Sequence, residues 1–182
     1  MKKIMVILAE GFEEIEAVGA VDILRRCGFE VVTAGLDSTT INGAHQIEIH
    51  ADKKLSELNP EDFDAVVLPG GMPGSANLRD SIEVKNTVTA VYQQGGIAAA
   101  ICAAPMALAA FGLTEKRRIT GYPGMENQFG NCNYTGNMAE TDGRIVTGKG
   151  PAAVFEFAAA LAEALGKSAN EVLKGMLYSG SL

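Results

Sequence analysis

Cys102 is the residue of this sequence whose type and position best suit it to chemistry. It follows the uncharged segment Ile97–Ile101, which is typical of a buried strand, and it precedes the expected helix Ala103–Phe111. A thiol at a helix N-terminus lies near free backbone N–H groups and a partial positive charge, and both lower its pKa. Strand, sharp turn and helix together form a nucleophile elbow. The pattern predicts a reactive thiol, with a buried inert cysteine as the alternative.

A glycine-rich segment could supply the anion-stabilising groups that such a thiol needs. Pro-Gly-Gly-Met-Pro-Gly occupies residues 69–74, directly after the apolar segment Asp64–Leu68. Backbone N–H groups at Gly70 and Gly71, together with that of Ala103, could converge on a developing oxyanion. A plain turn is the alternative. A phosphate-binding P-loop is excluded because no Lys-Ser/Thr pair follows the glycines.

Four acidic residues near the N-terminus could supply a proton donor: Glu10, Glu13, Glu14 and Glu16. Glu13 and Glu16 are three residues apart and share one face of the helix expected from Glu13 to Arg26. A carboxyl turned inward beside the thiol would have its pKa raised by desolvation and by like charge, and would remain able to donate a proton. Alternatively, these acids face water and complement the helix dipole.

Histidine is scarce in this chain. His45 and His50 both precede Cys102, in a segment that alternates like a hairpin, and none follows the cysteine. A Cys–His dyad usually performs hydrolysis or amide transfer, so the sequence disfavours an amidotransferase or a Cys-His-Asp protease. We expect both histidines at the surface, although either could still reach the pocket.

The elements that must position these residues alternate between strand and helix. Strands are expected at Lys3–Ala9, Phe29–Leu36, Asp64–Leu68, Ile97–Ile101, Arg118–Thr120, Met138–Glu140 and Arg144–Thr147, and helices at Glu13–Arg26, Ser81–Gln94, Ala103–Phe111, Pro151–Leu165 and after a capping box at Ser168 and Glu171. This alternation predicts an α/β fold in which helices cover both faces of a mainly parallel sheet. One domain spanning residues 1–182 is expected. Its chemistry should lie beyond the carboxyl ends of the strands.

Composition excludes several classes of protein. The net charge of −7, without a basic stripe, argues against nucleic-acid binding. The uncharged run at residues 97–113 is shorter than the ~20 residues of a membrane span, and the apolar run after the two N-terminal lysines is too short for a signal peptide. Cys27, Cys102 and Cys132 form no CxxC pair, so zinc and dithiol redox sites are not expected and a reduced, cytoplasmic setting is favoured.

Four motifs occur in an order and spacing that resemble the ThiJ/PfpI superfamily, in the branch of the Parkinson's-disease protein and its bacterial relatives. They read VILAEGFEEIEAV, VVLPGGMPG, AAICAAP and GKGPAAVFEF. The resemblance implies a flavodoxin-like three-layer sandwich, a homodimer and no cofactor or metal. It also implies a nucleophilic Cys102, a protonated Glu16 bonded to it, and an oxyanion site at the amides of Gly71 and Ala103.

The sequence departs from this family at two positions of the implied pocket. Tyr122 stands where many members carry a histidine after the cysteine, and tyrosine is a poor base near neutral pH. His45 stands where an anion-binding arginine is usual. Both are retained as possible pocket residues, and the first departure lowers the turnover that we expect.

Three functions are compatible with these residues. The first is a cofactor-independent enzyme of the glyoxalase or deglycase kind, in which the Cys102 thiolate adds to a small aldehyde or glycated substrate and Glu16 moves the proton. The second is a redox-sensing stress-response protein that responds through oxidation of Cys102. The third is a protein without chemistry, and a Cys102 pKa at or above the ordinary thiol value would favour it.

Overall fold

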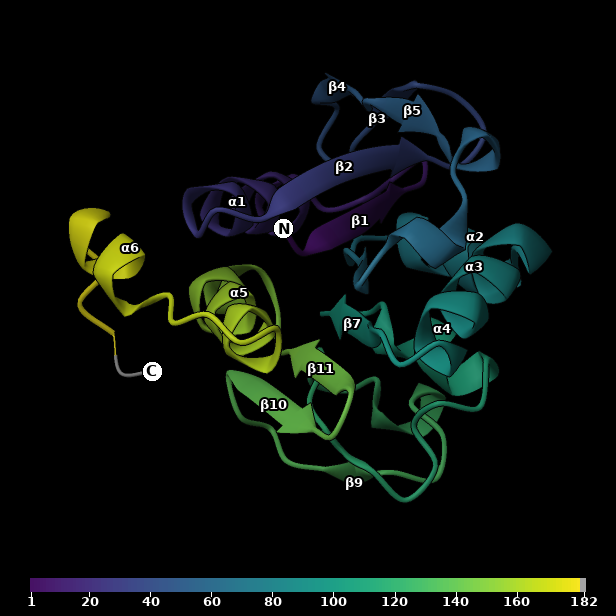
Figure 1. Cartoon of the computed structure of the whole chain (residues 1–182). Coiled ribbons are helices and arrows are strands. Elements are labelled where there is room, and N and C mark those ends of the chain that lie inside the picture. Colours follow the sequence, from purple (N-terminus) through teal and green to yellow (C-terminus); the bar gives the residue numbers. More distant parts are fainter. Residues whose placement is uncertain (181–182) are drawn as a thin grey trace.

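A seven-stranded sheet runs through the centre of the computed structural model, which describes residues 1–180 (Figure 1). The strand order is β10-β11-β7-β6-β1-β2-β5, and only the edge pair of β10 and β11 is antiparallel among these strands. The strands are β1 (Lys3–Leu8), β2 (Glu30–Gly35), β5 (Lys53–Lys54), β6 (Ala65–Leu68), β7 (Ile97–Ile101), β10 (Ala139–Asp142) and β11 (Ile145–Gly148).

Helices cover both faces of this sheet. One face carries α1 (Glu14–Arg26), α5 (Val154–Ala164) and α6 (Asn170–Gly175), and the other carries α2 (Gly74–Asp80), α3 (Ile82–Gln93) and α4 (Pro105–Ala110). The predicted three-layer, flavodoxin-like α/β architecture is therefore confirmed. None of the helices in the described chain has both the length and the apolarity that crossing a bilayer requires.

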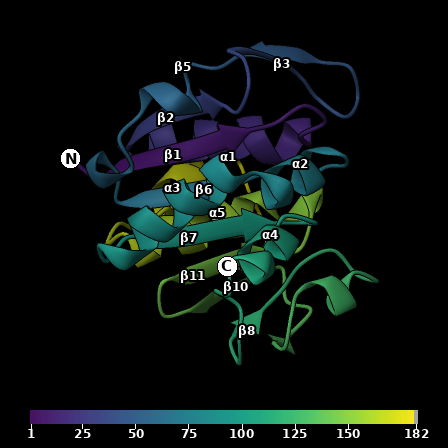
Figure 2. The same ribbon diagram turned by 90° about the vertical axis from the view of Figure 1, so that its right-hand side faces the viewer.

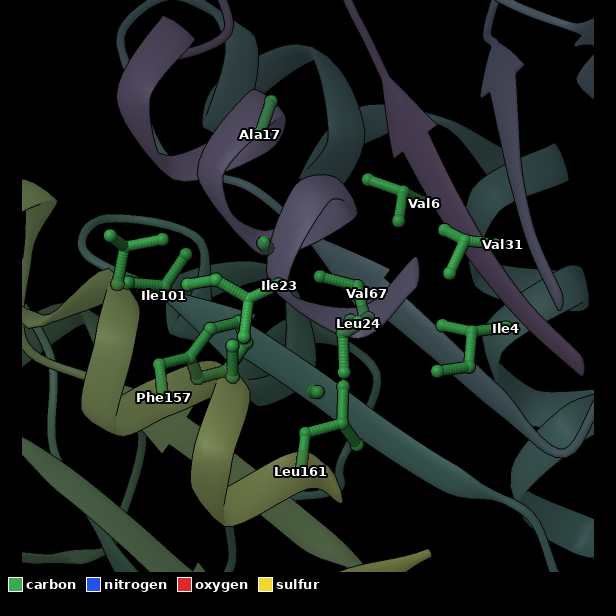
Figure 3. Close-up of a cluster of buried hydrophobic side chains, with 14 of the residues drawn as sticks. Ile4, Val6, Ala17, Ile23, Leu24, Val31, Val67, Ile101, Phe157 and Leu161 are labelled. Atoms are coloured by element: carbon green, nitrogen blue, oxygen red, sulfur yellow. The ribbon is translucent and has the colours of Figure 1, made fainter. Parts of the chain in front are cut away.

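The two hydrophobic cores follow from the alternation of side chains along the strands. In β1, Ile4 and Val6 point toward α1 and α5, whereas Met5 and Ile7 point toward the opposite helices. Figure 3 shows the first core, in which strand residues meet aliphatic and aromatic side chains of the two helices: Ile23, Leu24, Phe157 and Leu161. Because the centre of the sheet is buried on both faces, its central strands β6 and β7 are apolar without interruption.

Two small ladders lie outside the central sheet. β3 (Thr40–Asn42) and β4 (Glu48–His50) pair antiparallel, which confirms the predicted hairpin, and β8 (Arg118–Ile119) pairs with β9 (Asn133–Tyr134). Single 3-10 turns occupy Leu55–Glu57, Pro60–Asp62, Glu126–Gln128 and Pro151–Ala153.

Several elements differ from the sequence prediction. The helix expected from Pro151 begins at Val154, after a 3-10 turn. The helix expected from Ala103 begins only at Pro105, because proline occupies the first helical turn and the three preceding residues form a turn. The capping box at Ser168 is absent: Ala169 is the N-cap, and the Ser168 hydroxyl instead accepts from the backbone N–H of Asn170. Helix α2, which follows the glycine-rich loop, was not predicted.

The strands β1, β6 and β7 are neighbours, and their carboxyl ends meet at one edge of the sheet (Figure 2). The chain leaves β1 toward β2 on one side and later returns to place β6 on the other side. The crevice beside β1 is therefore the topological switch point at which open α/β sheets bind ligands. The acidic segment, the glycine-rich loop and Cys102 follow these three strands.

Candidate functional site

Cys102 occupies a strained turn between β7 and α4. Its φ of 64° lies in the left-handed region, which costs a residue with a side chain roughly 1–3 kcal/mol. Two backbone hydrogen bonds hold the turn: the N–H of Cys102 donates to the carbonyl of Gly148 at 2.9 Å, and the N–H of Tyr122 donates to the carbonyl of Cys102 at 2.8 Å. The predicted elbow is therefore present, and the side chain is 7% exposed.

Glu16 brings a fully buried carboxyl to this thiol. The backbone N–H of Gly70 donates to its Oε2 at 2.7 Å, whereas its Oε1 has no hydrogen-bond partner of standard geometry among residues 1–180. The Cys102 thiol interacts with the same carboxyl. Burial, and in addition the charge of Glu13, raise the pKa of Glu16 to about 7 against the opposing effect of the bonds from Cys102 and Gly70.

The pKa of the Cys102 thiol moves in the direction opposite to the prediction. Burial raises it to about 12, with further increases from the charge of Glu16 and from the hydrogen bond to it. Backbone hydrogen bonds from Gly71 and Ala103 act to lower it. Desolvation prevails because α4 starts three residues beyond the cysteine and is only one and a half turns long, so its N-terminus offers little compensation.

Of the two groups, Glu16 is therefore the easier to ionise. Near pH 7 the thiol is protonated and Glu16 is ionised in about half of the molecules; above pH 7 the pair holds one proton, which resides on the sulfur while the carboxylate stands beside it as an acceptor. A raised thiol pKa is what an inert cysteine would show. An inert cysteine would not, however, account for the buried carboxyl aimed at it, the two amides directed at its sulfur, or the strained backbone that presents it.

The glycines of the 69–74 loop are required by this packing. A Cβ on Gly70 would lie 2.5 Å from Glu16 Oε2 and 2.6 Å from Cys102 Cβ. Gly71 has a φ of 89°, and a Cβ there would lie 2.4 Å from the backbone N of Glu13. Because both contacts are far inside van der Waals distance, the loop is fitted to the site, which a plain turn would not need to be.

Glu13 and Glu14 have roles that the sequence did not separate. Glu13 is the N-cap of α1: its Oε2 accepts from the N–H of Glu16 at 2.7 Å, while its own N–H donates to the carbonyl of Gly70 at 2.8 Å. It thereby fixes Glu16 against the glycine loop. Glu14 is buried on the other side of the helix start and faces the β3–β4 hairpin. Spacing alone could not reveal which acid turns inward.

His45 pairs with Glu14 rather than with the thiol. Its Nδ1 lies 2.8 Å from Glu14 Oε2, and its backbone N–H donates to Glu14 Oε1 at 2.6 Å, while the ring remains largely exposed. The hydrogen bond and charge of Glu14 raise the pKa of His45. Possible ligand atoms of Glu13, Glu14 and His45 lie within 4.8 Å of one another, but the bonds from His45 to Glu14 and the capping of α1 by Glu13 already explain this arrangement without a metal.

Tyr122 joins the site through its backbone. Its side chain is 49% exposed and lies beside Gly150, in the loop after β11. The structure thus brings together Cys102, Glu16 and the amides of Gly71 and Ala103, while it places Tyr122 next to them and His45 at the hairpin.

The sequence and the fold of this chain are similar to those of known proteins. The model of the DJ-1/PfpI family matches residues 2–164. The chain is 39% identical to Protein dj-1beta of Drosophila melanogaster over 98% of both chains, and the crystal structure of that protein has a TM-score of 0.92, covering 98% of this chain and 99% of that one.

Two further similarities concern a sequence and a structure. The chain is 31% identical to the glutathione-independent glyoxalase DJR-1.2 of Caenorhabditis elegans, over 91% of this chain and 90% of the relative. It is 34% identical to the oxidised form of Toxoplasma gondii DJ-1, with a TM-score of 0.92 and coverage of 99% and 100%.

Proposed function

The chain belongs to the DJ-1/PfpI family, and from this premise we propose that it is a cofactor-independent enzyme that converts small 2-oxoaldehydes into 2-hydroxy acids. One observation carries the proposal: a buried carboxyl with a pKa of about 7 faces a cysteine sulfur that also receives two backbone N–H groups. This arrangement combines a nucleophile, a base and an oxyanion site. The glyoxalase of Caenorhabditis elegans, which aligns along nine tenths of the chain, supports the reaction class.

The first step would use the proton of the pair. The Glu16 carboxylate takes the thiol proton as the sulfur attacks the aldehyde carbon, so a C–S bond forms and negative charge moves to the aldehyde oxygen. The amides of Gly71 and Ala103 stabilise that charge. Glu16 then returns the proton to the oxygen, which gives a neutral hemithioacetal and regenerates the carboxylate. This route needs no standing thiolate, so the raised thiol pKa is compatible with it.

The second step would be an internal redox exchange. Glu16 removes the hydrogen of the former aldehyde carbon as a proton and delivers it to the neighbouring ketone carbon, by way of an enediol, while the hydroxyl proton on the former aldehyde carbon passes to the ketone oxygen. The aldehyde carbon is thereby oxidised to a thioester and the ketone carbon reduced to an alcohol, so no external oxidant is consumed. Water then attacks the thioester, the C–S bond breaks, and the sulfur recovers its proton as the hydroxy acid leaves.

A redox-sensing role is the second candidate. It is favoured by the amides and by the carboxyl around the sulfur, which could hold sulfinate oxygens, and by the oxidised Toxoplasma gondii homologue. Oxidation follows thiolate character and exposure, however, and Cys102 is buried with a raised pKa.

The same pocket would serve deglycation, because a glycated amine presents a related carbonyl-derived carbon to the sulfur.

An assay of methylglyoxal turnover tests the proposal. Wild type should produce lactate, and Cys102→Ala should lose at least a hundredfold in kcat/KM, because the nucleophile is removed. Tyr122→His should increase the rate if an imidazole next to the cysteine is what the site lacks. Cys27→Ala is the matched control and should retain activity, since Cys27 lies at the C-terminal end of α1, whereas Glu16 lies at its N-terminal end.

Equal lactate formation by wild type and Cys102→Ala would contradict the proposal. Peroxide-dependent gain of mass at Cys102, in a wild type that turns over no aldehyde, would instead favour the redox role.

A further inference from the structure

Glu13 is a buried acid that the proposed reaction does not use. The residue is 7% exposed, and no lysine or arginine of residues 1–180 forms an ion pair with it. Taking a carboxylate out of water without a cationic partner costs free energy. Buried charges of this kind are typical of functional sites, where they set the properties of a neighbouring group.

Capping of α1 does not by itself require a glutamate at this position. Glu13 caps the helix because its Oε2 accepts from the backbone N–H of Glu16 at 2.7 Å. The preferred N-cap residues are Ser, Thr, Asp and Asn, whose shorter side chains reach the same N–H groups. Three of these four residues would cap the helix without burying a charge, so a purely structural role would favour them over glutamate.

Three hydrogen bonds close a ring that includes the carboxyl of Glu16. The N–H of Glu13 donates to the carbonyl of Gly70 at 2.8 Å, and the N–H of Gly70 donates to Glu16 Oε2 at 2.7 Å. The bond from the N–H of Glu16 to Glu13 Oε2 completes the ring. The same loop directs the amide of Gly71 at the sulfur of Cys102. Glu13 therefore fixes the base and the oxyanion loop together.

We infer that Glu13 is a positioning residue of the reaction: its carboxylate holds Glu16 and the glycine-rich loop at the Cys102 sulfur, and its negative charge makes Glu16 the stronger base. The inference rests on the proposed function, in which Glu16 takes the thiol proton. A like charge nearby disfavours the ionised form of a carboxyl, so ionised Glu16 binds a proton more tightly. Burial, and in addition the charge of Glu13, raise the pKa of Glu16 to about 7. A base acts best when its pKa is close to the working pH.

The titratable groups that face Glu13 and Glu16 come from three elements. Cys102, in the turn between β7 and α4, interacts with Glu16. Glu14 of α1 and His45 of the β3–β4 hairpin have possible ligand atoms within 4.8 Å of Glu13, whereas the contacts from Gly70 are made by its backbone. His45 is paired with Glu14 and its ring is largely exposed, so it offsets little of the charge of Glu13.

The pH dependence of kcat/KM for methylglyoxal separates the charge of Glu13 from its hydrogen bonds. Glu13→Gln keeps an acceptor for the N–H of Glu16 but removes the charge. The midpoint of the rise in kcat/KM, expected at about 7 in wild type, should therefore fall by about 0.5 pH units or more. Glu13→Asp restores both the cap and the charge, so its midpoint should lie closer to that of wild type.

Two further variants complete the comparison. Glu13→Ala removes the cap as well as the charge and should in addition lower kcat about tenfold with little change in KM, because the base is no longer held in place. Glu14→Gln is the matched control: Glu14 is the neighbouring buried acid of α1 but faces the hairpin, so this variant should leave the midpoint unchanged.

The outcomes separate the inference from the proposed function. Wild-type midpoints and kcat values in both Glu13→Gln and Glu13→Ala, with methylglyoxal still turned over, would overturn the inference and leave the proposed function intact. Equal shifts in Glu13→Gln and Glu14→Gln would also overturn it, because the effect would then belong to the overall charge of the helix start.

An infrared titration tests the inference if wild type turns over no aldehyde. The protonated carboxyl of Glu16 gives a C=O stretching band that disappears on ionisation and is missing from Glu16→Gln. The midpoint of this band should be about 7 in wild type, unchanged in Glu14→Gln and lower in Glu13→Gln. This shift without turnover would contradict the proposed function and still show that Glu13 sets the basicity of Glu16. Equal midpoints in the three proteins, each with native circular dichroism, would overturn the inference.

Discussion

At the scale of single residues, the protonation state of Glu16 sets the pH range in which the site can react. If its carboxylate takes the thiol proton, kcat/KM should rise with pH, with an apparent pKa of about 7, and stay level to pH 9, because the thiol pKa of about 12 is not reached. Glu16→Gln should lower kcat/KM by about a hundredfold or more and abolish the rise at pH 7. Initial rates from pH 5.5 to 9 measure both effects. A rate that falls between pH 6 and 8 would contradict this role.

Glu16→Gln should also change Tm in a way that depends on pH, which the replacement of a residue with only a structural role would not do. Burial raises the pKa of Glu16 from 4.5 to about 7, so the folded state is more stable when this carboxyl is neutral. Its contribution to stability is full below pH 4.5 and is lost as the pH rises through 7. Glu16→Gln, which stays neutral, should therefore raise Tm relative to wild type at pH 8 and have little effect at pH 4.5. Carboxylates forced to ionise in a buried site commonly trade stability for activity in this way.

Residue types and order predicted that Cys102, the glycine-rich loop and the acidic segment would meet, because the carboxyl ends of adjacent parallel strands must converge, whereas the choice of Glu16 and Gly71 rested on the family resemblance. The direction of the thiol pKa was not predictable. It depends on how much of the sulfur is desolvated, which is set by the packing of three separate loops and by the late start of α4 at Pro105. The inward turn of Glu16, with Glu14 facing the hairpin, was equally hidden, since all acids of the helix start are alike in spacing.

At the scale of elements, the β3–β4 hairpin is held to the start of α1 by Glu14. This carboxylate accepts from the N–H of His45 and contacts its ring, and the N–H of Ala44 donates to the carbonyl of Phe12 at 2.7 Å. Burial acts to raise the pKa of Glu14, but the bonds from the hairpin outweigh it and lower the pKa. The sequence predicted the hairpin from its alternation, yet gave no sign of this attachment.

The attachment should depend on pH. The raised pKa of His45 means that its contribution to stability is full below 6.5 and is lost as the pH rises through the raised value. The lowered pKa of Glu14 means that its contribution is present above 4.5 and is lost as the pH falls. The ion pair between His45 and Glu14 is therefore complete between pH 4.5 and pH 6.5. His45→Ala should lower Tm by a few degrees at pH 5.5 and by less at pH 8.5.

A double-mutant cycle isolates the pair from other effects of the substitution. Tm and chemical unfolding of His45→Ala, Glu14→Gln and the double variant should show coupling at pH 5.5 that shrinks at pH 8.5. Coupling that is equal at the two pH values would assign the contact to the hydrogen bond alone, without the charge of the imidazolium.

At the scale of the whole molecule, one apolar face remains uncovered within the described chain. Ile15 and Val18 on α1 are 59% and 51% exposed, and Ile47 on the hairpin is 56% exposed. The N–H of Ile47 points at Glu14 Oε1 at 3.5 Å, and Val18 shares a hollow with Ile49, so the helix and the hairpin lie side by side and their exposed apolar residues define a patch. Patches of this kind mark interaction surfaces in soluble proteins.

We propose that a second copy of the chain covers this patch, since a twofold axis lets a self-complementary surface bury the same patch on both copies at once.

Light scattering tests this proposal and should give the mass of two chains for wild type. Val18→Glu should shift the protein to monomer, because each dimer would bury two unpaired carboxylates. Ile82→Glu is the matched control: Ile82 is 69% exposed but lies on α3, on the opposite side of the sheet, and its variant should remain a dimer. A monomeric wild type, or equal dissociation by both variants, would show that the patch is not the interface. Because α1 also carries Glu16, loss of the dimer should reduce turnover as well, which ties the assembly of the molecule to its site.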